Sequence, residues 1–326
     1  MKKIAINGFG RIGRALFRLL ISNKNYEIVA INDIASPKVL AHLLKYDSIH
    51  GVLPYNVDYS EGSIICDSVF VPTINIPELT KLNWKKYDVD VVFECTGLFK
   101  NYSANSLHIK AGAKNVILSS APSSNDIDMV VLGVNDTKIN LSNKIISNAS
   151  CTTNCAAPMI KVLDDMLGVQ SAYVTTVHSY TSDQNLHDGV HSDLRRARSA
   201  PHSIIPTTTG AAKALSYIFP NILIGGCGIR VPVSNGSLTD ITCIVKNNAD
   251  ITTINNEFLQ KSKSSYKNII LYNTSPIVSV DILSNSYSCV FDSTLTYVMG
   301  DMVKIVGWYD NEYGYASRLI DLLDRV

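Results

Sequence analysis

The sequence lacks long hydrophobic runs and has almost no excess of either charge. Its 326 residues are 46% hydrophobic and 17% charged, and the formal net charge is +1, which is ordinary for a globular protein. The apolar runs are too short to cross a bilayer as a helix, and the balanced charge offers no basic field for a nucleic acid. The composition therefore predicts no membrane span and no nucleic-acid partner.

The sequence also lacks paired cysteines and an apolar leader. The opening stretch MKKIAINGFGRIGR is interrupted by Asn7, Gly8 and Gly10, whereas a secretory signal needs roughly 7–15 apolar residues in a row. The seven cysteines are scattered, with no CxxC pair and no Cys/His zinc spacing. We therefore expect reduced thiols, no metal site and a cytoplasmic protein.

Strand and helix patterns alternate in the first half of the chain. Apolar runs at residues 2–8 and 26–33 flank the segment RIGRALFRLLISNK, whose apolar residues recur at helical spacing. The strand signal repeats in VDVVFECTG, AKNVILSS and DMVVLGVN. This alternation predicts a mostly parallel sheet that is covered by helices.

A glycine motif, GFGRIG at residues 8–13, lies between the first strand and the first helix. Glycines at this spacing allow a tight turn, close approach of the backbone to a pyrophosphate, and close packing of helix on strand. Such a motif alone is often only a flexible loop, but here Asp33 ends the next strand. Its carboxylate can accept a hydrogen bond from a ribose 2′-hydroxyl and repels a 2′-phosphate, although it could also be a strand-end cap. The context predicts dinucleotide binding, with NAD favoured over NADP.

Cys151 lies near a predicted helix N-terminus. The stretch SNASCTTNCAAPMIKVLDDMLG passes from a polar turn into helical spacing, and Pro158 is best tolerated near a helix start. The helix should begin between Cys151 and Cys155, where free N–H groups favour an anion, so we expect a lowered thiol pKa and a nucleophilic Cys151. The alternative is a buried structural cysteine, which describes Cys155 better.

His178 is the best candidate for the base that a nucleophilic cysteine usually needs. It ends a strand in which Val174, Thr176 and His178 alternate with residues of the other face. The sequence alone leaves open whether the two side chains meet. The other histidines lie in helix-like or loop segments and are predicted to be solvated: His42, His50, His108, His187, His191 and His202.

A long polar stretch, residues 179–206, precedes a second predicted helix start. The stretch contains DLRRAR and leads into the hydroxyl-rich turn Thr207–Gly210, which opens the helix AAKALSYIF. Arginines of this kind are usually a solvated face. Together with threonine hydroxyls and free N–H groups, however, they are typical of a phosphate site.

These segments closely resemble the phosphorylating glyceraldehyde-3-phosphate dehydrogenases. The matching motifs, spread over the chain in the family's order, are INGFGRIGR, HLLKYDSIHG, SNASCTTNC, HSYTSDQ, DLRRAR, IIPTTTGAAKA, RVP and WYDNEYGY. The resemblance implies an α/β protein with a Rossmann NAD-binding domain at residues 1–150, completed by a C-terminal helix at 316–326. It also implies an α+β catalytic domain with a largely antiparallel sheet at 151–315, and a homotetramer.

The resemblance also implies a role for particular residues. Cys151 would be the nucleophile and His178 its base. The cofactor residues would be Gly8, Gly10, Arg11, Ile12, Asp33, Thr96, Ser119, Asn311 and Tyr315. The substrate phosphate would be bound by Thr181 and Arg230, and inorganic phosphate by Ser150, Thr152, Arg196, Thr209 and Gly210.

The implied reaction is the NAD-dependent conversion of glyceraldehyde 3-phosphate and phosphate into 1,3-bisphosphoglycerate, in glycolysis or gluconeogenesis. It would pass through a thiohemiacetal and a thioester on Cys151. Gly189-Val190 replaces the Leu-Pro of many NAD-specific members, which keeps NADP as a weaker alternative. Three other functions are alternatives to this reaction: erythrose-4-phosphate dehydrogenase, a nonenzymatic NAD- or RNA-binding protein, and a semialdehyde dehydrogenase. The intact Thr207–Gly210 turn and the Tyr180-Thr181 pair favour the main interpretation.

Overall fold

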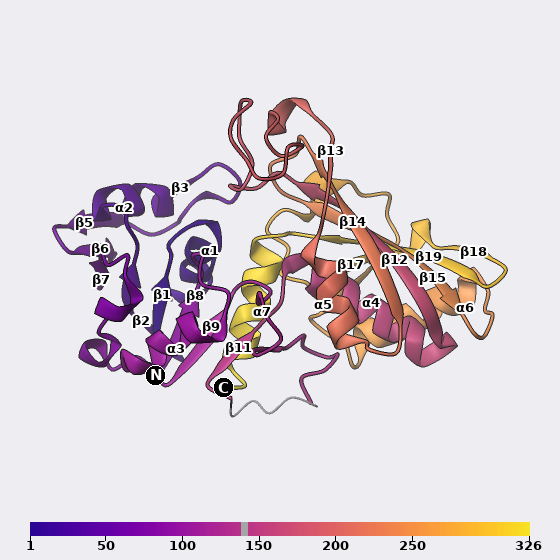
Figure 1. Ribbon diagram of the computed structural model, residues 1–326, viewed down its shortest axis with the longest axis horizontal. Coiled ribbons are helices and arrows are strands. Elements are labelled where there is room, and N and C mark those ends of the chain that lie inside the picture. Colours follow the sequence, from indigo (N-terminus) through magenta and orange to yellow (C-terminus); the bar gives the residue numbers. More distant parts are fainter. Residues whose placement is uncertain (138–142) are drawn as a thin grey trace. The chain divides into compact units, whose positions relative to one another are not determined.

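The computed structural model describes residues 1–137 and 143–326 and divides the chain into two compact units. Unit 1 contains Met1–Val130, the described residues 143–149, and Ala316–Val326. Unit 2 contains Val131–Thr137 and Ser150–Tyr315. Figure 1 shows the elements of both units.

Unit 1 is built on a sheet with the strand order β10-β11-β9-β8-β1-β2-β7-β6-β5. Pairing is parallel from β10 to β7 and antiparallel in the β7-β6-β5 edge. Its strands are β1 (Lys2–Asn7), β2 (Tyr26–Asn32), β5 (Val57–Ser60), β6 (Ser63–Cys66), β7 (Val69–Ile74), β8 (Val91–Glu94), β9 (Asn115–Leu118), β10 (Asp128–Met129) and β11 (Ile145–Ser147), and β3 (Tyr46–Asp47) pairs with β4 (Gly51–Val52). The helices are α1 (Arg11–Leu20), α2 (Pro37–Lys45), α3 (Tyr102–Lys110) and α7 (Tyr313–Leu323), and short 3₁₀ turns cover Leu79–Lys81 and Trp84–Tyr87.

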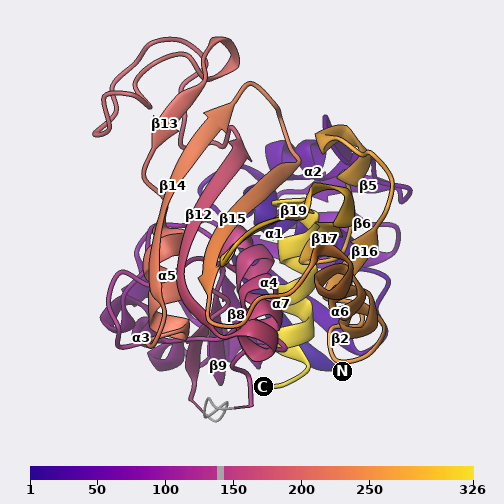
Figure 2. The same cartoon turned by 90° about the vertical axis from the view of Figure 1, so that its right-hand side faces the viewer.

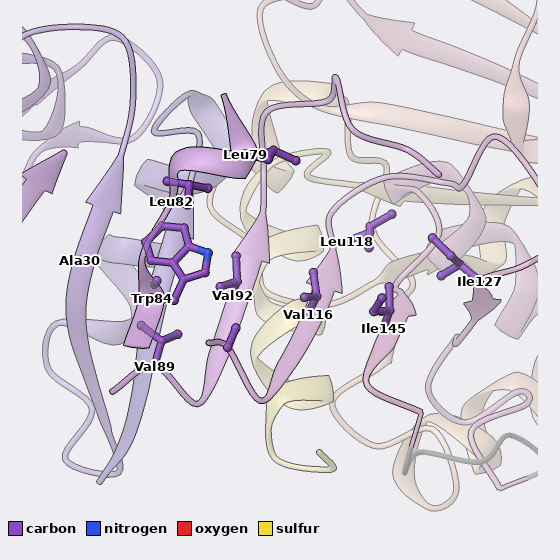
Figure 3. Close-up of a cluster of buried hydrophobic side chains, with 12 residues drawn as sticks. Ala30, Leu79, Leu82, Trp84, Val89, Val92, Val116, Leu118, Ile127 and Ile145 are labelled. Carbon is purple, nitrogen blue, oxygen red and sulfur yellow. The ribbon is translucent and has the colours of Figure 1, made fainter. Parts of the chain in front are cut away.

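Burial on both faces of this sheet explains why the strands read as continuous apolar runs, since the consecutive residues Val91, Val92 and Phe93 of β8 are all buried. Val92, Val116 and Ile145 come from neighbouring strands and point into one cluster with Trp84 (Figure 3). Trp84 is fully buried. Parallel strands that are buried on both faces need not alternate apolar and polar residues. Because these strands are parallel, their carboxyl ends lie at the same edge of the sheet.

Unit 2 is built on a sheet with the order β13-β14-β12-β15-β19-β17-β16, and β18 pairs with β19. Figure 2 shows β13, β14, β12 and β15 side by side. The strands are β12 (Val169–Ser179), β13 (Ile205–Thr207), β14 (Leu223–Val231), β15 (Ser237–Val245), β16 (Ile270–Asn273), β17 (Cys289–Asp292), β18 (Tyr297–Met299) and β19 (Met302–Tyr309). The helices are α4 (Cys151–Leu167), α5 (Gly210–Ile218) and α6 (Ile251–Lys263), and 3₁₀ turns cover Ala200–His202, Ser279–Ile282 and Ser293–Leu295.

The pairing in unit 2 is largely antiparallel, as predicted, with two parallel pairs, β12 with β14 and β16 with β17. Helix α4 packs on β12, β15, β17 and β19, while α5 packs on β14. The mixed α/β class with a parallel sheet in the first half is confirmed. This packing sets the start of α4 beside the end of β12.

One predicted strand is much shorter than its pattern suggested. In DMVVLGVN only Asp128–Met129 form β10, and the chain then turns. The Asn135 Oδ1 atom accepts the backbone N–H of Val131 at 2.8 Å, and the Asp136 Oδ1 atom accepts that of Gly133 at 2.9 Å. These short polar side chains compete with strand pairing for the backbone, which explains why the strand ends early.

Candidate active site

The glycine-rich loop between β1 and α1 is closely packed at Gly8 and Gly13 and open at Gly10. Gly8 has φ +93°, and a Cβ atom there would lie 2.7 Å from the backbone nitrogen of Thr96. A Cβ at Gly13 would lie 2.3 Å from the Gly8 carbonyl oxygen. At Gly10, apart from its chain neighbours, no described residue has an atom within 4 Å of the Cβ position. The loop is therefore fixed by two glycines and leaves free space at the third, which fits the approach of a pyrophosphate.

Asp33 lies directly after β2 and is joined to this loop. Its Oδ2 atom accepts the backbone N–H of Phe9 at 2.7 Å, and its Oδ1 atom accepts that of Ala35 at 2.9 Å. Each carboxylate oxygen can accept a further hydrogen bond, so the group can still bind ribose hydroxyls. Ile12 lies half-buried in α1.

Arg11, a predicted cofactor residue, is engaged by a carboxylate. Its NH1 and NH2 atoms donate to Asp47 Oδ2 and Oδ1 at 2.6 and 3.1 Å. This bidentate pair joins the first turn of α1 to β3. The guanidinium therefore has a structural partner whether or not it also contacts a cofactor.

Thr96 and Ser119, predicted to line the nucleotide groove, are both bound to Glu94. The backbone N–H of Thr96 donates to Glu94 Oε1 at 2.8 Å, and the Thr96 hydroxyl donates to the same oxygen. The Ser119 hydroxyl donates to the Glu94 carbonyl oxygen at 3.0 Å. The predicted groove residues are thus positioned by a residue that the sequence analysis did not single out.

Glu94 is a buried carboxylate that is surrounded by donors. Its Oε2 atom accepts from the Asn7 amide at 2.6 Å and lies 3.1 Å from Nε2 of His108. The Trp84 indole N–H points at Nδ1 of His108 over 3.0 Å. Because an indole nitrogen can only donate, the imidazole proton must be on Nε2, where it donates to Glu94. The prediction that His108 is solvated is wrong, because this histidine is fully buried.

Cys151 is the first residue of α4, as the sequence predicted. The Ser150 hydroxyl accepts the backbone N–H of Thr153 at 3.2 Å and so caps the helix. Ala149, the residue before Ser150, has φ +51°, which costs a non-glycine residue backbone strain. The chain therefore turns sharply just before the thiol.

His178 meets this thiol, which the sequence alone left open. It lies at the end of β12, and its Nε2 atom is 3.6 Å from the Cys151 Sγ atom. Its Nδ1 atom lies 2.7 Å from the Ser179 carbonyl oxygen and 2.8 Å from NH1 of Arg230. The carbonyl can only accept and the guanidinium can only donate, so these two neighbours favour opposite tautomers.

Tyr309, which the sequence analysis did not single out, bridges α4 and β12, the two elements that carry Cys151 and His178. The phenol oxygen lies 2.8 Å from the Thr152 hydroxyl in α4 and 2.8 Å from the Thr176 hydroxyl in β12. The ring is 1% exposed and packs edge-on against His178. Its place within the motif WYDNEYGY was the available signal.

Comparison with known proteins identifies these two halves. Residues 2–102 match "Glyceraldehyde 3-phosphate dehydrogenase, NAD binding domain", and residues 150–311 match "Glyceraldehyde 3-phosphate dehydrogenase, C-terminal domain". The chain belongs to the glyceraldehyde-3-phosphate dehydrogenase family.

Individual members of this family are similar over nearly the whole chain. A protein of that name from Mycobacterium avium is 48% identical over 333 residues, covering 99% of this chain and 98% of the relative. One from Thermotoga maritima is 47% identical over 329 residues, with 99% and 98% covered. "Glyceraldehyde-3-phosphate dehydrogenase 2" from Bacillus subtilis is 46% identical over 328 residues, with 99% and 96% covered.

The protonation of the thiol differs from the expectation. Burial raises the pKa of Cys151 to about 11, although the charge of Arg230 and backbone hydrogen bonds at the start of α4 act to lower it. Burial, followed by the positive charge of Arg230, lowers the pKa of His178 to about 3. The prediction of a lowered thiol pKa is therefore wrong, because desolvation outweighs the helix terminus. Both shifts favour the uncharged pair, a thiol beside a neutral imidazole.

Two of the predicted phosphate residues, Arg230 and Arg196, place positive charge near His178. The NH1 atom of Arg230 donates to the Ser179 carbonyl oxygen at 3.1 Å, and the charge of Arg196 also lowers the pKa of His178. The Thr209 hydroxyl accepts the backbone N–H of Ala211 at 3.2 Å and caps α5, whose first residue is Gly210. Thr181 is half-buried two residues after Ser179.

Asn311 is oriented by two serines. Its Oδ1 atom accepts from the Ser179 hydroxyl at 2.9 Å and from the Ser237 hydroxyl at 3.0 Å. The amide nitrogen must then face away from the serines, where it can donate. Tyr315 is buried in the first turn of α7. Within residues 1–137 and 143–326, no helix is long and apolar enough to cross a membrane, and no cluster of three or more His, Cys, Asp or Glu could hold a metal ion.

Proposed function

We propose that this chain carries out the phosphorylating, NAD-dependent oxidation of D-glyceraldehyde 3-phosphate to 1,3-bisphosphoglycerate, with Cys151 as nucleophile and His178 as its base. The observation that carries the proposal is the 3.6 Å contact between Sγ and Nε2 at the start of α4. Family membership supports the substrate and the cofactor. The metabolic role is glycolytic or gluconeogenic.

The residues of unit 1 fit NAD. The free space above Gly10 and the open acceptor sites of Asp33 suit a pyrophosphate and a ribose, and the carboxylate disfavours a 2′-phosphate. When it is bound, NAD supplies the acceptor for a hydride. The residues proposed to hold it are Gly8, Gly10, Arg11, Ile12, Asp33, Thr96, Ser119, Asn311 and Tyr315.

The first step is addition of Sγ of Cys151 to the aldehyde carbon, which forms a thiohemiacetal. The thiol proton passes to Nε2 of His178, which returns it to the carbonyl oxygen as the thiohemiacetal hydroxyl forms and is then neutral again. This requires that the imidazole carry its other proton on Nδ1, donated to the Ser179 carbonyl oxygen. Arg230 opposes that tautomer while it faces Nδ1 over 2.8 Å. A substrate phosphate that draws Arg230 toward itself and Thr181 leaves Nδ1 to Ser179, so binding prepares the base.

The second step removes a hydride from the thiohemiacetal carbon while His178 takes the hydroxyl proton, and it leaves a thioester on Cys151. The backbone N–H of Cys151 and protonated His178 stabilise charge on the oxygen. An oxygen of inorganic phosphate then attacks the carbonyl carbon, the C–S bond breaks, and the acyl phosphate leaves. The residues proposed to hold this phosphate are Ser150, Thr152, Arg196, Thr209 and Gly210.

The hydroxyl groups of two of these residues already have partners. The Ser150 oxygen caps α4, and the Thr152 oxygen contacts Tyr309. To bind phosphate they must rotate or share these hydrogen bonds. The N–H groups of Arg196 also have partners, but Arg196 carries a full positive charge and is therefore the stronger anion donor.

We also infer a homotetramer in a reducing compartment, the cytoplasm. Support for the assembly comes from the apolar side chains that the loop 180–206 exposes, namely Leu186, Val190, Leu194 and Ile204. All seven cysteines are free thiols, which suits a reducing compartment. Gly189-Val190, in place of the Leu-Pro of many NAD-specific members, keeps NADP as a weaker alternative.

The experiment follows NADH absorbance with glyceraldehyde 3-phosphate, with and without phosphate, for the wild type and Cys151→Ser. Parallel assays replace NAD with NADP, and the aldehyde with erythrose 4-phosphate. The expected result is phosphate-dependent NADH formation that is lost in the variant. Faster turnover of erythrose 4-phosphate, or a rate that is indifferent to phosphate, would overturn the proposal.

A further inference from the structure

Arg196, a proposed ligand of inorganic phosphate, is held by groups of two kinds. Its Nε atom donates to the Thr207 hydroxyl at 2.9 Å, and NH2 donates to the Thr208 carbonyl oxygen at 3.1 Å. Its NH1 atom instead donates to Oδ2 of Asp183 at 2.6 Å. One end of the guanidinium is therefore anchored to the threonine turn, while the other is paired with an anion.

Asp193 supports the end of the guanidinium that is anchored to the threonine turn. The Thr207 hydroxyl donates to Asp193 Oδ2 at 2.6 Å, and the same oxygen lies 3.8 Å from Nε of Arg196. These contacts orient the guanidinium plane independently of Asp183. The Arg196 side chain is 18% exposed, whereas the Asp183 side chain is 56% exposed, so Asp183 can rotate into solvent without disturbing the anchor.

We propose that Asp183 competes with inorganic phosphate for NH1 of Arg196 and so sets the affinity of this site for phosphate. The inference rests on the proposed function, because it assumes that Arg196 binds the attacking phosphate. A carboxylate oxygen and a phosphate oxygen make the same charge-assisted hydrogen bond to a guanidinium. NH1 carries two N–H groups, but two anions on one nitrogen repel each other, so phosphate binds best when Asp183 has moved away.

His191 offers Asp183 a second partner when phosphate binds. The Nδ1 atom of His191 accepts the backbone N–H of Asp193 at 2.8 Å and lies 3.1 Å from the Asp193 carbonyl oxygen, so the shorter contact favours a ring proton on Nε2. That nitrogen lies 3.5 Å from Oδ2 of Asp183. The carboxylate can thus leave Arg196 and still face a donor, which keeps the cost of its displacement small.

The test is the KM for phosphate in wild type, Asp183→Asn and a matched control, Asp188→Asn. Asparagine keeps the shape of Asp183 and removes its charge. An exposed ion pair contributes an amount equivalent to about a two- to fivefold change in a binding constant, so the KM for phosphate should fall about two- to fivefold in Asp183→Asn. The difference should shrink in high salt. Asp188 pairs with Arg198 at 2.8 Å in the same loop, so its variant should keep the wild-type KM.

A double variant shows whether the effect passes through Arg196. In an Arg196→Ala background, Asp183→Asn should leave the KM for phosphate unchanged. A raised KM for phosphate in Asp183→Asn would mean that Asp183 orients Arg196. An effect that persists without Arg196 would mean that the charge of Asp183 repels phosphate directly, without competing for Arg196. Either outcome overturns the proposal. Wild-type enzyme with no dependence on phosphate would instead refute the proposed function, so the two failures are distinguishable.

Discussion

Replacing Asp47 with asparagine tests the carboxylate that holds Arg11 at the start of α1. Burial alone would raise the pKa of Asp47, but hydrogen bonds from Arg11 and from the backbone N–H groups of His50 and Ile49 outweigh it and lower the pKa to about 2 from 3.8. The folded protein thus binds the proton less tightly than the unfolded chain. The resulting stability is present above pH 4 and is lost as the pH falls toward 2.

The size of the effect follows from that shift. A fall from 3.8 to about 2 corresponds to about 2 kcal/mol of the free energy of unfolding, at roughly 1.4 kcal/mol per pKa unit. The Asp47 side chain is 3% exposed, so solvent screening removes little of it. Asp47→Asn should therefore destabilise unit 1 by about 2 kcal/mol at pH 6 and by about half as much at pH 3.

The assay is urea unfolding followed by tryptophan fluorescence. The chain has two tryptophans, one in each unit, and Trp308→Phe leaves Trp84 as the reporter of unit 1. Both the parent and the Asp47→Asn variant carry that replacement and are measured without NAD at several pH values. A difference that does not depend on pH, or that is absent at pH 6, would refute the electrostatic account of the Arg11–Asp47 pair.

Two further substitutions probe the cofactor loop and the catalytic pair. Gly10→Ala should raise the KM for NAD at least about tenfold, because the new methyl group occupies the space proposed for the pyrophosphate. Its free energy of unfolding should change by less than about 0.5 kcal/mol, because the Cβ position is open. The control, Gly13→Ala, should lower the free energy of unfolding by about 1–3 kcal/mol, and similar stability of the two variants in calorimetry would contradict the packing argument. Tyr309→Phe removes two buried hydrogen bonds. It should lower the free energy of unfolding by about 2 kcal/mol, as measured by calorimetry, and lower kcat, as measured by NADH formation. Unchanged stability would mean that the two threonine hydroxyls find other partners.

Local signals in the sequence predicted much of the site. The helix start near Cys151 and the alternating strand that ends at His178 are each visible within a few neighbouring residues. The glycine motif is also visible locally, although the backbone that constrains Gly8 belongs to Cys95 and Thr96, which are distant in the sequence. The contact between thiol and imidazole needed the tertiary structure, since it depends on how α4 packs on β12.

Features that depend on distant partners could not be predicted. His108 looked solvated because nothing nearby in sequence shows that Trp84 and Glu94 enclose it. The pKa of Cys151 was misjudged because the helix N-terminus is visible in the sequence but the extent of burial is not. The pairing of Arg196 with Asp183 likewise joins residues that belong to different motifs.

Glu94 has a consequence for how unit 1 folds. Its charge is surrounded by neutral donors from separate segments: Asn7 in β1, Thr96 after β8, and His108 in α3. Asn7 is held in turn by Asn32 at the end of β2. A carboxylate that loses water before these donors are in place carries a penalty of several kcal/mol. Partly assembled forms of the sheet are therefore disfavoured, and this single charge makes the folding of unit 1 more cooperative.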